Sequence, residues 1–174
     1  MLLKRISIFS APYSVRELTE KDLPQMLALE KSQADYLKLQ GKSDLTIDEI
    51  KSDLTSVPLS VNQNQKWTLG FFKDEKLVAI IDFLTDYPQV QTVWIGLFLV
   101  SKGDEGKGIA THLSKAFFKS LKSEQFTNVQ TLKYEQETTN QILLEKLGFI
   151  DQQPLVLKSS DGSNIPAILS KLTL

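Results

Sequence analysis

A glycine-rich segment in the second half of the chain has the residue types of an anion-binding turn. It stands between an apolar run and an amphipathic run. Unpaired backbone N–H groups at the start of a helix, together with the positive end of the helix dipole, bind pyrophosphate-like anions. Glycines in such a turn remove side chains where the backbone must approach the anion closely. The segment reads Glu105, Gly106, Lys107, Gly108, Ile109, Ala110, Thr111.

Two nucleotide-binding motifs can be compared with this turn, and neither fits it. A Walker A loop needs Ser or Thr directly after Gly-Lys and a longer glycine spacing, whereas Gly108 follows Lys107 here. A dinucleotide-binding fingerprint needs a third glycine where Thr111 stands, in a parallel βαβ unit that begins at the first strand. A plain helix-capping turn remains an alternative explanation at this point.

A carboxylate within an apolar strand is the second candidate for chemistry. Asp82 interrupts the apolar run 77–84, where a carboxylate is costly unless it is solvated or paired. Burial would raise the pKa of Asp82 toward the range of a general base. The alternative is that Asp82 faces solvent on an alternating strand. Asp86 follows in the next turn, and the two acids together favour a cationic amine as substrate. His112 is the only histidine, and we interpret it as a packing or surface residue.

Composition limits the classes of function that the chain can have. The 174 residues suit one domain, and 41% of them are apolar and 24% charged, which is typical of a soluble globular protein. The net charge of −1 gives no indication of nucleic-acid binding. The absence of cysteine excludes disulfides, thiolate zinc sites and a cysteine nucleophile. Without a secretion signal or a membrane span, we expect a cytoplasmic protein that binds no membrane.

The turn and Asp82 must be positioned by a series of alternating helices and strands. The first dozen residues are predicted to form a loose arm in front of a single domain that covers residues 1–174. Apolar periodicity and capping signals predict the elements that follow. Strands are expected at 13–18, 67–72, 77–84, 90–100, 128–134, 149–157 and 165–172, and helices from Thr19 to Gly41, over 46–54, after the glycine turn, and over 138–147.

This order of elements indicates an α/β or α+β layered domain. Three consecutive strands, 67–72, 77–84 and 90–100, read as an antiparallel meander, and the last two strands form a closing hairpin. The fold class is therefore a mixed, mostly antiparallel sheet of about seven strands with helices on both faces.

The glycine turn resembles the acetyl-CoA-binding turn of the Gcn5-related N-acetyltransferase (GNAT) family. That motif is Arg or Gln, two residues, Gly, one residue, then Gly or Ala, and the glycines, Ile109 and Ala110 fit it. Glu105 departs from the family's Arg or Gln. The segment 144–149, which ends in Gly148-Phe149, resembles the family's late helix, and the order of elements matches over 13–172.

The resemblance implies a cofactor site. Acetyl-CoA would be the co-substrate, with its pantetheine arm in a gap between the strand 90–100 and the strand 128–134. Backbone groups of Phe98, Leu99 and Val100 would line that arm. The turn from Glu105 to Thr111 would hold the pyrophosphate, and Asn140 would touch the cofactor or remain a solvated helix residue.

The resemblance also implies direct acetyl transfer to an amine, without an acyl-enzyme. A carboxylate, for which Asp82 is the candidate, would take the proton of the amine. Many family members protonate the leaving thiolate with a tyrosine at the position of Leu144, and Tyr134 is the substitute candidate. The acceptor, a small molecule or a peptide amine, is not identified, and a homodimer is compatible with the resemblance. The alternatives are a non-catalytic acyl-CoA-binding module of the same fold and, less in keeping with the motifs, a nucleotide-dependent enzyme.

Overall fold

A computed structural model describes residues 1–174 and places seven strands in one mixed sheet, in the order β1-β2-β3-β4-β5-β7-β6. Every neighbouring pair is antiparallel except β4 and β5, which run parallel. The predicted class of fold is confirmed. The strands are β1 (Ser14–Glu17), β2 (Lys66–Lys73), β3 (Lys76–Thr85), β4 (Thr92–Val100), β5 (Asn128–Tyr134), β6 (Ile150–Lys158) and β7 (Asn164–Thr173).

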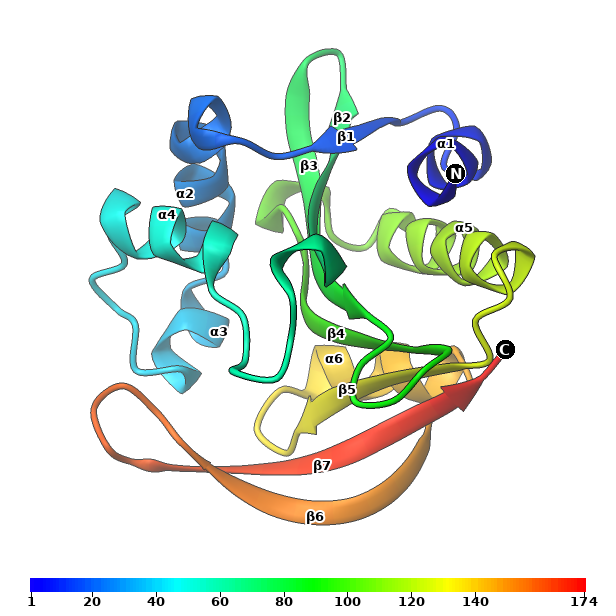
Figure 1. Cartoon of the computed structure of the whole chain (residues 1–174). Coiled ribbons are helices and arrows are strands. Elements are labelled where there is room, and N and C mark those ends of the chain that lie inside the picture. Colours follow the sequence, from blue (N-terminus) through cyan, green and yellow to red (C-terminus); the bar gives the residue numbers. More distant parts are fainter.

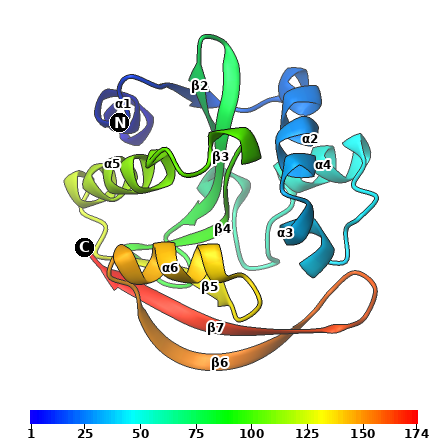
Figure 2. The ribbon, with the colours of Figure 1, turned by 180° about the vertical axis from the view of Figure 1, so that it is seen from behind.

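Helices cover both faces of the sheet (Figures 1 and 2). One face carries α1, α5 and α6, and the other carries α2, α3 and α4. Each group buries its own apolar cluster against the strands, with Phe71, Phe83 and Phe117 in the first and Leu45, Ile50 and Ile80 in the second. The helices are α1 (Leu2–Phe9), α2 (Leu23–Ser32), α3 (Ala34–Leu39), α4 (Ile47–Thr55), α5 (Ile109–Ser123) and α6 (Thr138–Lys146).

Local capping follows the sequence closely. Asp22 accepts a hydrogen bond from the Thr19 N–H, and Thr46 forms a capping box with Glu49 at the start of α4. The single helix predicted between Thr19 and Gly41 is wrong, because the chain breaks at Gln33 into α2 and α3. The cause is tertiary, since the Gln33 side chain reaches across to β4.

The parting of β4 from β5 is the feature that opens the sheet. Their ladder covers four residue pairs, from Thr92 with Asn128 to Ile95 with Thr131, and then stops. The pairing with β3 jumps at the same point, so that Gly96 is an extra residue on β4. Such a bulge bends a strand and changes its direction. Beyond Gly96, β4 stays paired with β3 and moves away from β5.

The predicted loose arm at residues 1–12 is wrong, because its first part forms helix α1. Leu2 and Ile6, one turn apart, are buried against the sheet and α5, and the Arg5 guanidinium lies 2.5 Å from the Glu124 carboxylate. The i, i+4 apolar spacing is a usable signal of this helix. The charges of Lys4 and Arg5 are compatible with a short amphipathic helix.

We expect Ile6→Ala to destabilise the protein by about 3 kcal/mol, since it removes a side chain that has no exposed surface and leaves a cavity. Ile8 is 61% exposed on the same helix, so Ile8→Ala should change stability by less than about 0.5 kcal/mol. Urea unfolding of both variants is the measurement. Equal stabilities would show that α1 is not docked in solution.

Candidate active site

The gap between β4 and β5 contains a cavity of about 90 Å³. Phe98 and Leu97 line it from β4, Leu132 and Tyr134 from β5, and Leu144 from α6. A hydrogen bond from Ser101 N to Val78 O fixes the alternation of the β3–β4 ladder. In an antiparallel ladder with this alternation, the N–H and C=O groups of Phe98 and Val100 point away from β3, toward the gap.

The glycine turn leads from the end of β4 into α5 and presents free backbone donors. Gly106 and Gly108 have φ angles of +75° and +76°, and a Cβ at either position would meet no neighbouring atom. None of the N–H groups from Gly106 to Thr111 donates within the protein, and the first bond of α5 runs from His112 N to Gly108 O. Converging donors at the positive end of a 15-residue helix form a site for an anionic group.

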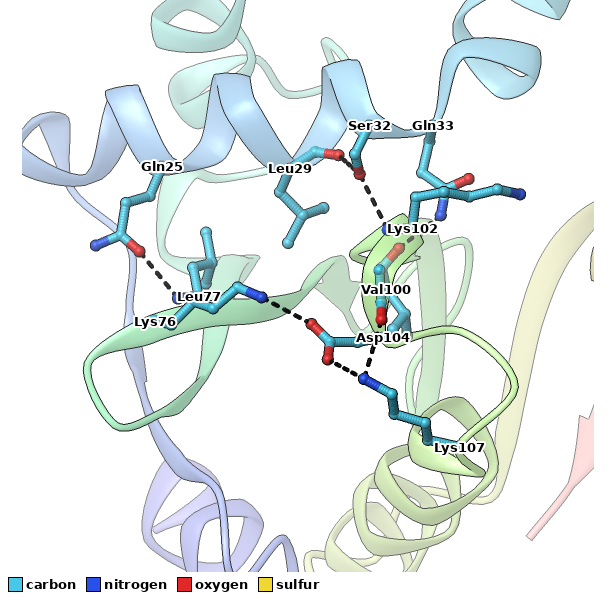
Figure 3. A network of polar contacts seen from close by, with 11 residues as sticks. Gln25, Leu29, Ser32, Gln33, Lys76, Leu77, Val100, Lys102, Asp104 and Lys107 are labelled. Atoms are coloured by element: carbon cyan, nitrogen blue, oxygen red, sulfur yellow. Dashed lines mark hydrogen bonds and ion pairs between the residues drawn. The ribbon is translucent and has the colours of Figure 1, made fainter.

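A wider cleft of about 490 Å³ joins this turn to the gap. Ten of the eleven predicted cofactor residues line it: Phe98, Leu99, Val100, Glu105, Gly106, Gly108, Ile109, Ala110, Thr111 and Asn140. Lys107 does not line it, and its ammonium donates to Gly103 O and pairs with Asp104 at 2.9 Å (Figure 3). Only the backbone of Lys107 is left to contribute.

Helix α2 anchors the start of the turn (Figure 3). The Ser32 hydroxyl accepts a hydrogen bond from Lys102 N at 3.1 Å, and the Gln33 amide donates to Val100 O at 2.6 Å. Asp104 forms ion pairs with both Lys76 and Lys107, which ties the turn to β3. These contacts fix the turn from two sides and explain why the chain leaves its helix at Gln33.

Glu105, the departure from the family pattern, is held by neighbours. Its carboxylate accepts a hydrogen bond from Gln33 at 2.6 Å and pairs with Lys102 at 2.9 Å. Although burial opposes them, these contacts keep the pKa of Glu105 below its ordinary value. The negative charge of Glu105 beside the turn is therefore compensated by the Lys102 ammonium, and the two contacts fix the orientation of its side chain.

Asn140 of α6 and Glu137, the residue directly before α6, line both the cleft and the gap. Asn140 has a buried side-chain oxygen that forms no hydrogen bond in the protein, so it has a position for a ligand donor. Glu137 lines both spaces, and burial, with a contribution from the Glu105 charge, raises its pKa to about 7.

A second chamber, of about 250 Å³, lies beside β4 among α2, α3, α4, β2 and β3. It contains Asp82, the predicted base, but the Asp82 carboxylate pairs with Lys66 at 2.7 Å and accepts a hydrogen bond from Thr68 at 2.6 Å. The Asp82 carboxylate is thus already paired within the protein. Asp86 does not line the chamber, and its carboxylate accepts a hydrogen bond from Gln91 N in the turn.

Glu30 is the acid that sequence reasoning missed. It is 8% exposed and lines the second chamber. Burial, the charges of Asp53 and Asp82, and only partial compensation by Lys42 raise the pKa of Glu30 to about 7. The sequence carried a signal, because Glu30 follows Met26 by four residues and so falls within the apolar stripe of α2.

Tyr36 joins the three spaces, because it lines the gap, the cleft and the second chamber. Its ring packs edge-on against Tyr134, with the ring centroids 6.4 Å apart. Burial raises the pKa of Tyr36 and, less strongly, that of Tyr134, so both phenols stay protonated at neutral pH. Leu144 is buried and lines the gap, where it cannot donate a proton.

His112, interpreted from the sequence as a packing or surface residue, is exposed on α5. Its ring lies 6.1 Å from the ring of Tyr13, and Nε2 lies 3.0 Å from Ala11 O. None of the helices combines the length and apolar character that a bilayer crossing requires.

The sequence matches the profile of the Acetyltransferase (GNAT) family over residues 23–149, which is more than half of the chain. The protein therefore belongs to the GNAT family. No curated protein matches it at a significant level.

Solved structures share the fold at low sequence identity. An acetyltransferase from Thermus thermophilus superimposes with a TM-score of 0.72 at 17% identity, covering 93% of this chain and 97% of that one. An N-acetyltransferase from Staphylococcus aureus gives 0.68 at 16%, covering 94% and 99%. The ribosomal-protein-alanine N-acetyltransferase from Brucella melitensis gives 0.68 at 16%, covering 92% and 99%. At these identities the likeness shows the fold alone.

We expect stability to fall as pH rises through 7, because of Glu30. A carboxyl whose pKa is raised on folding contributes fully below its unfolded value of 4.5, and its contribution is lost as pH rises through about 7. Glu30→Gln should leave the melting temperature unchanged near pH 4 and raise it at pH 8 by several degrees, on the order of 2 kcal/mol.

Thermal unfolding from pH 4 to 8 measures this effect, with Glu17→Gln as the matched control. Glu17 is exposed on β1, so its variant should follow the parent at every pH. Parallel curves for Glu30→Gln and the parent would show that Glu30 is not destabilised in the folded state.

Proposed function

We propose that this protein is an acetyl-CoA-dependent N-acetyltransferase that moves the acetyl group directly to an amine. The single observation that carries the proposal is the continuity of the free-amide turn, Gly106 to Thr111, with the gap where β4 leaves β5. Family membership supports acyl transfer in general. The geometry adds an anion site and a strand edge along one continuous path.

The residues present fit acetyl-CoA. The turn would hold the pyrophosphate through its N–H groups, and the Phe98 backbone and the Val100 N–H would pair with pantetheine amides as an added strand. The Val100 carbonyl is already used by Gln33. The unpartnered oxygen of Asn140 would accept a hydrogen bond from the cofactor arm.

Acetyl-CoA supplies the acetyl group as a thioester, so the C–S bond breaks as the amine nitrogen forms a C–N bond to the carbonyl carbon. The protein has to remove one proton from the amine and to accommodate the leaving thiolate. Tyr134 and Tyr36 are protonated phenols at the gap, and either would return a proton to the sulfur. The apolar lining from Leu97, Leu144 and Phe149 would exclude water that competes with the amine.

Thermal unfolding with acetyl-CoA, coenzyme A, ATP and NAD in parallel tests the proposal. A ligand that binds only the folded state raises the melting temperature by mass action, so no acceptor needs to be known. We expect a shift with acetyl-CoA and coenzyme A and none with ATP or NAD. A shift with ATP or NAD alone would favour a nucleotide-dependent enzyme.

Gly108→Ala locates the binding, because a methyl group at this left-handed position strains the turn and intrudes on the anion site. We expect at least a tenfold loss of acetyl-CoA affinity. Gly162→Ala is the matched control, since Gly162 has a φ of +82° and equally open surroundings in the β6–β7 turn. It should cost about 1 kcal/mol of stability and leave affinity unchanged. Equal affinities for the two variants would place the cofactor elsewhere.

A further inference from the structure

The second chamber carries more information about the acceptor than the sequence did. It meets the gap at Tyr36, Gly96 and Leu97. A molecule in this chamber would therefore reach the end of the gap without crossing the cofactor cleft. The inference drawn from it rests on the proposed function, because it concerns the amine that receives the acetyl group.

Five charged side chains line the chamber, and four of them form pairs. Lys66 lies 2.7 Å from Asp82, and Lys42 lies 3.5 Å from Asp53. Glu30 is the fifth and has no cation of its own. With three carboxylates and two ammonium groups, the chamber has a net charge of −1 when Glu30 is ionised.

Glu30 is unusual because a buried carboxylate normally has partners. Its side chain comes from α2, and the groups that face it are Asp53 from α4, Asp82 from β3, and Lys42 from the segment between α3 and α4. The two lysines of the chamber are engaged by the other carboxylates. The arrangement therefore has a position for one further positive charge, next to the junction with the gap.

We propose that the chamber binds a small primary amine that carries one positive charge and no carboxylate, and that Glu30 both pairs with its ammonium and accepts its proton. One such cation neutralises the chamber. A zwitterionic amino acid would leave the net charge at −1 and would place a fourth carboxylate beside Glu30, Asp53 and Asp82. Charge balance thus favours the amine over the corresponding amino acid.

The proton transfer balances. The ammonium gives one proton to the Glu30 carboxylate, and the neutral nitrogen then forms the C–N bond as the C–S bond breaks. The second proton lost from nitrogen when the amide forms leaves through solvent, and the thiolate is protonated by a phenol of the gap. A carboxyl with a pKa of about 7 is suited to this role, because it is ionised in half of the molecules at neutral pH and is a stronger base than an ordinary carboxylate.

The test compares amines with the amino acids from which they differ only by a carboxylate. The pairs are tyramine with tyrosine, phenethylamine with phenylalanine, and isobutylamine with valine. A peptide with an N-terminal alanine is tested beside them. Release of the coenzyme A thiol gives kcat/KM for each acceptor as a function of pH. We expect each amine that reacts to exceed its amino acid by at least tenfold, and the peptide to react more slowly than the amines.

Three variants assign the base. Glu30→Gln should lower kcat/KM for the amines by about 100-fold or more and remove the inflection near pH 7. Glu17→Gln should leave both unchanged. Glu137→Gln tests the other carboxyl with a pKa of about 7, which lies on the cofactor side, and should retain the inflection.

Binding of acetyl-CoA, measured in parallel by thermal shift, separates this inference from the proposed function. If acetyl-CoA does not bind, the proposed function itself fails. If it binds, the inference is overturned by preferred acetylation of the amino acids, by acetylation of the peptide alone, by turnover of no acceptor in the panel, or by a Glu30→Gln variant that behaves like Glu17→Gln.

Discussion

The site depends on one constraint, which is that the parallel ladder between β4 and β5 stops after Ile95 and Thr131. Backbone N–H and C=O groups need partners, and a strand edge without a neighbouring strand is a template for pairing with another extended chain. The bulge at Gly96 turns β4 while it remains bonded to β3. The sheet thus keeps its continuity on one side of β4 and offers Phe98 and Val100 to a ligand on the other.

The remaining parts of the molecule stabilise that opening. Gln33 breaks the helix between α2 and α3 and bonds to both Val100 and Glu105, so the end of β4 and the glycine turn share one anchor. Asp104, paired with Lys76 and Lys107, fixes the other side of the turn. The exposed amide donors therefore keep their direction without a ligand, which lowers the entropic cost of binding one.

Much of the fold and of the glycine turn was predictable because the signals are local. Capping residues, period-2 apolar runs and the glycines of the turn act over a few positions, and they placed the strands and most helices correctly. Phe98 and Val100, which we predicted as cofactor residues, both line the cleft, and the β3–β4 alternation directs their backbone groups away from β3.

The second chamber was not predictable in the same way, because it is made by elements that meet only in three dimensions. Asp82 was noticeable as an acid in an apolar strand, but the ion pair with Lys66 depends on the β2–β3 register. Glu30 and Tyr36 lie on separate helices, and their convergence follows from the break at Gln33. A charged residue within the apolar stripe of a helix, such as Glu30, is therefore as useful a signal of a functional site as a charged residue within an apolar strand, such as Asp82.

The central claim is that one path runs from the glycine turn, through the gap between β4 and β5, to the second chamber. A crystal structure with coenzyme A tests it most directly. The account predicts the pyrophosphate on the backbone amides of Gly106 to Thr111, the pantetheine arm beside Phe98, and the thiol next to Tyr36. A cofactor bound away from the turn, or an arm that does not enter the gap, would contradict it.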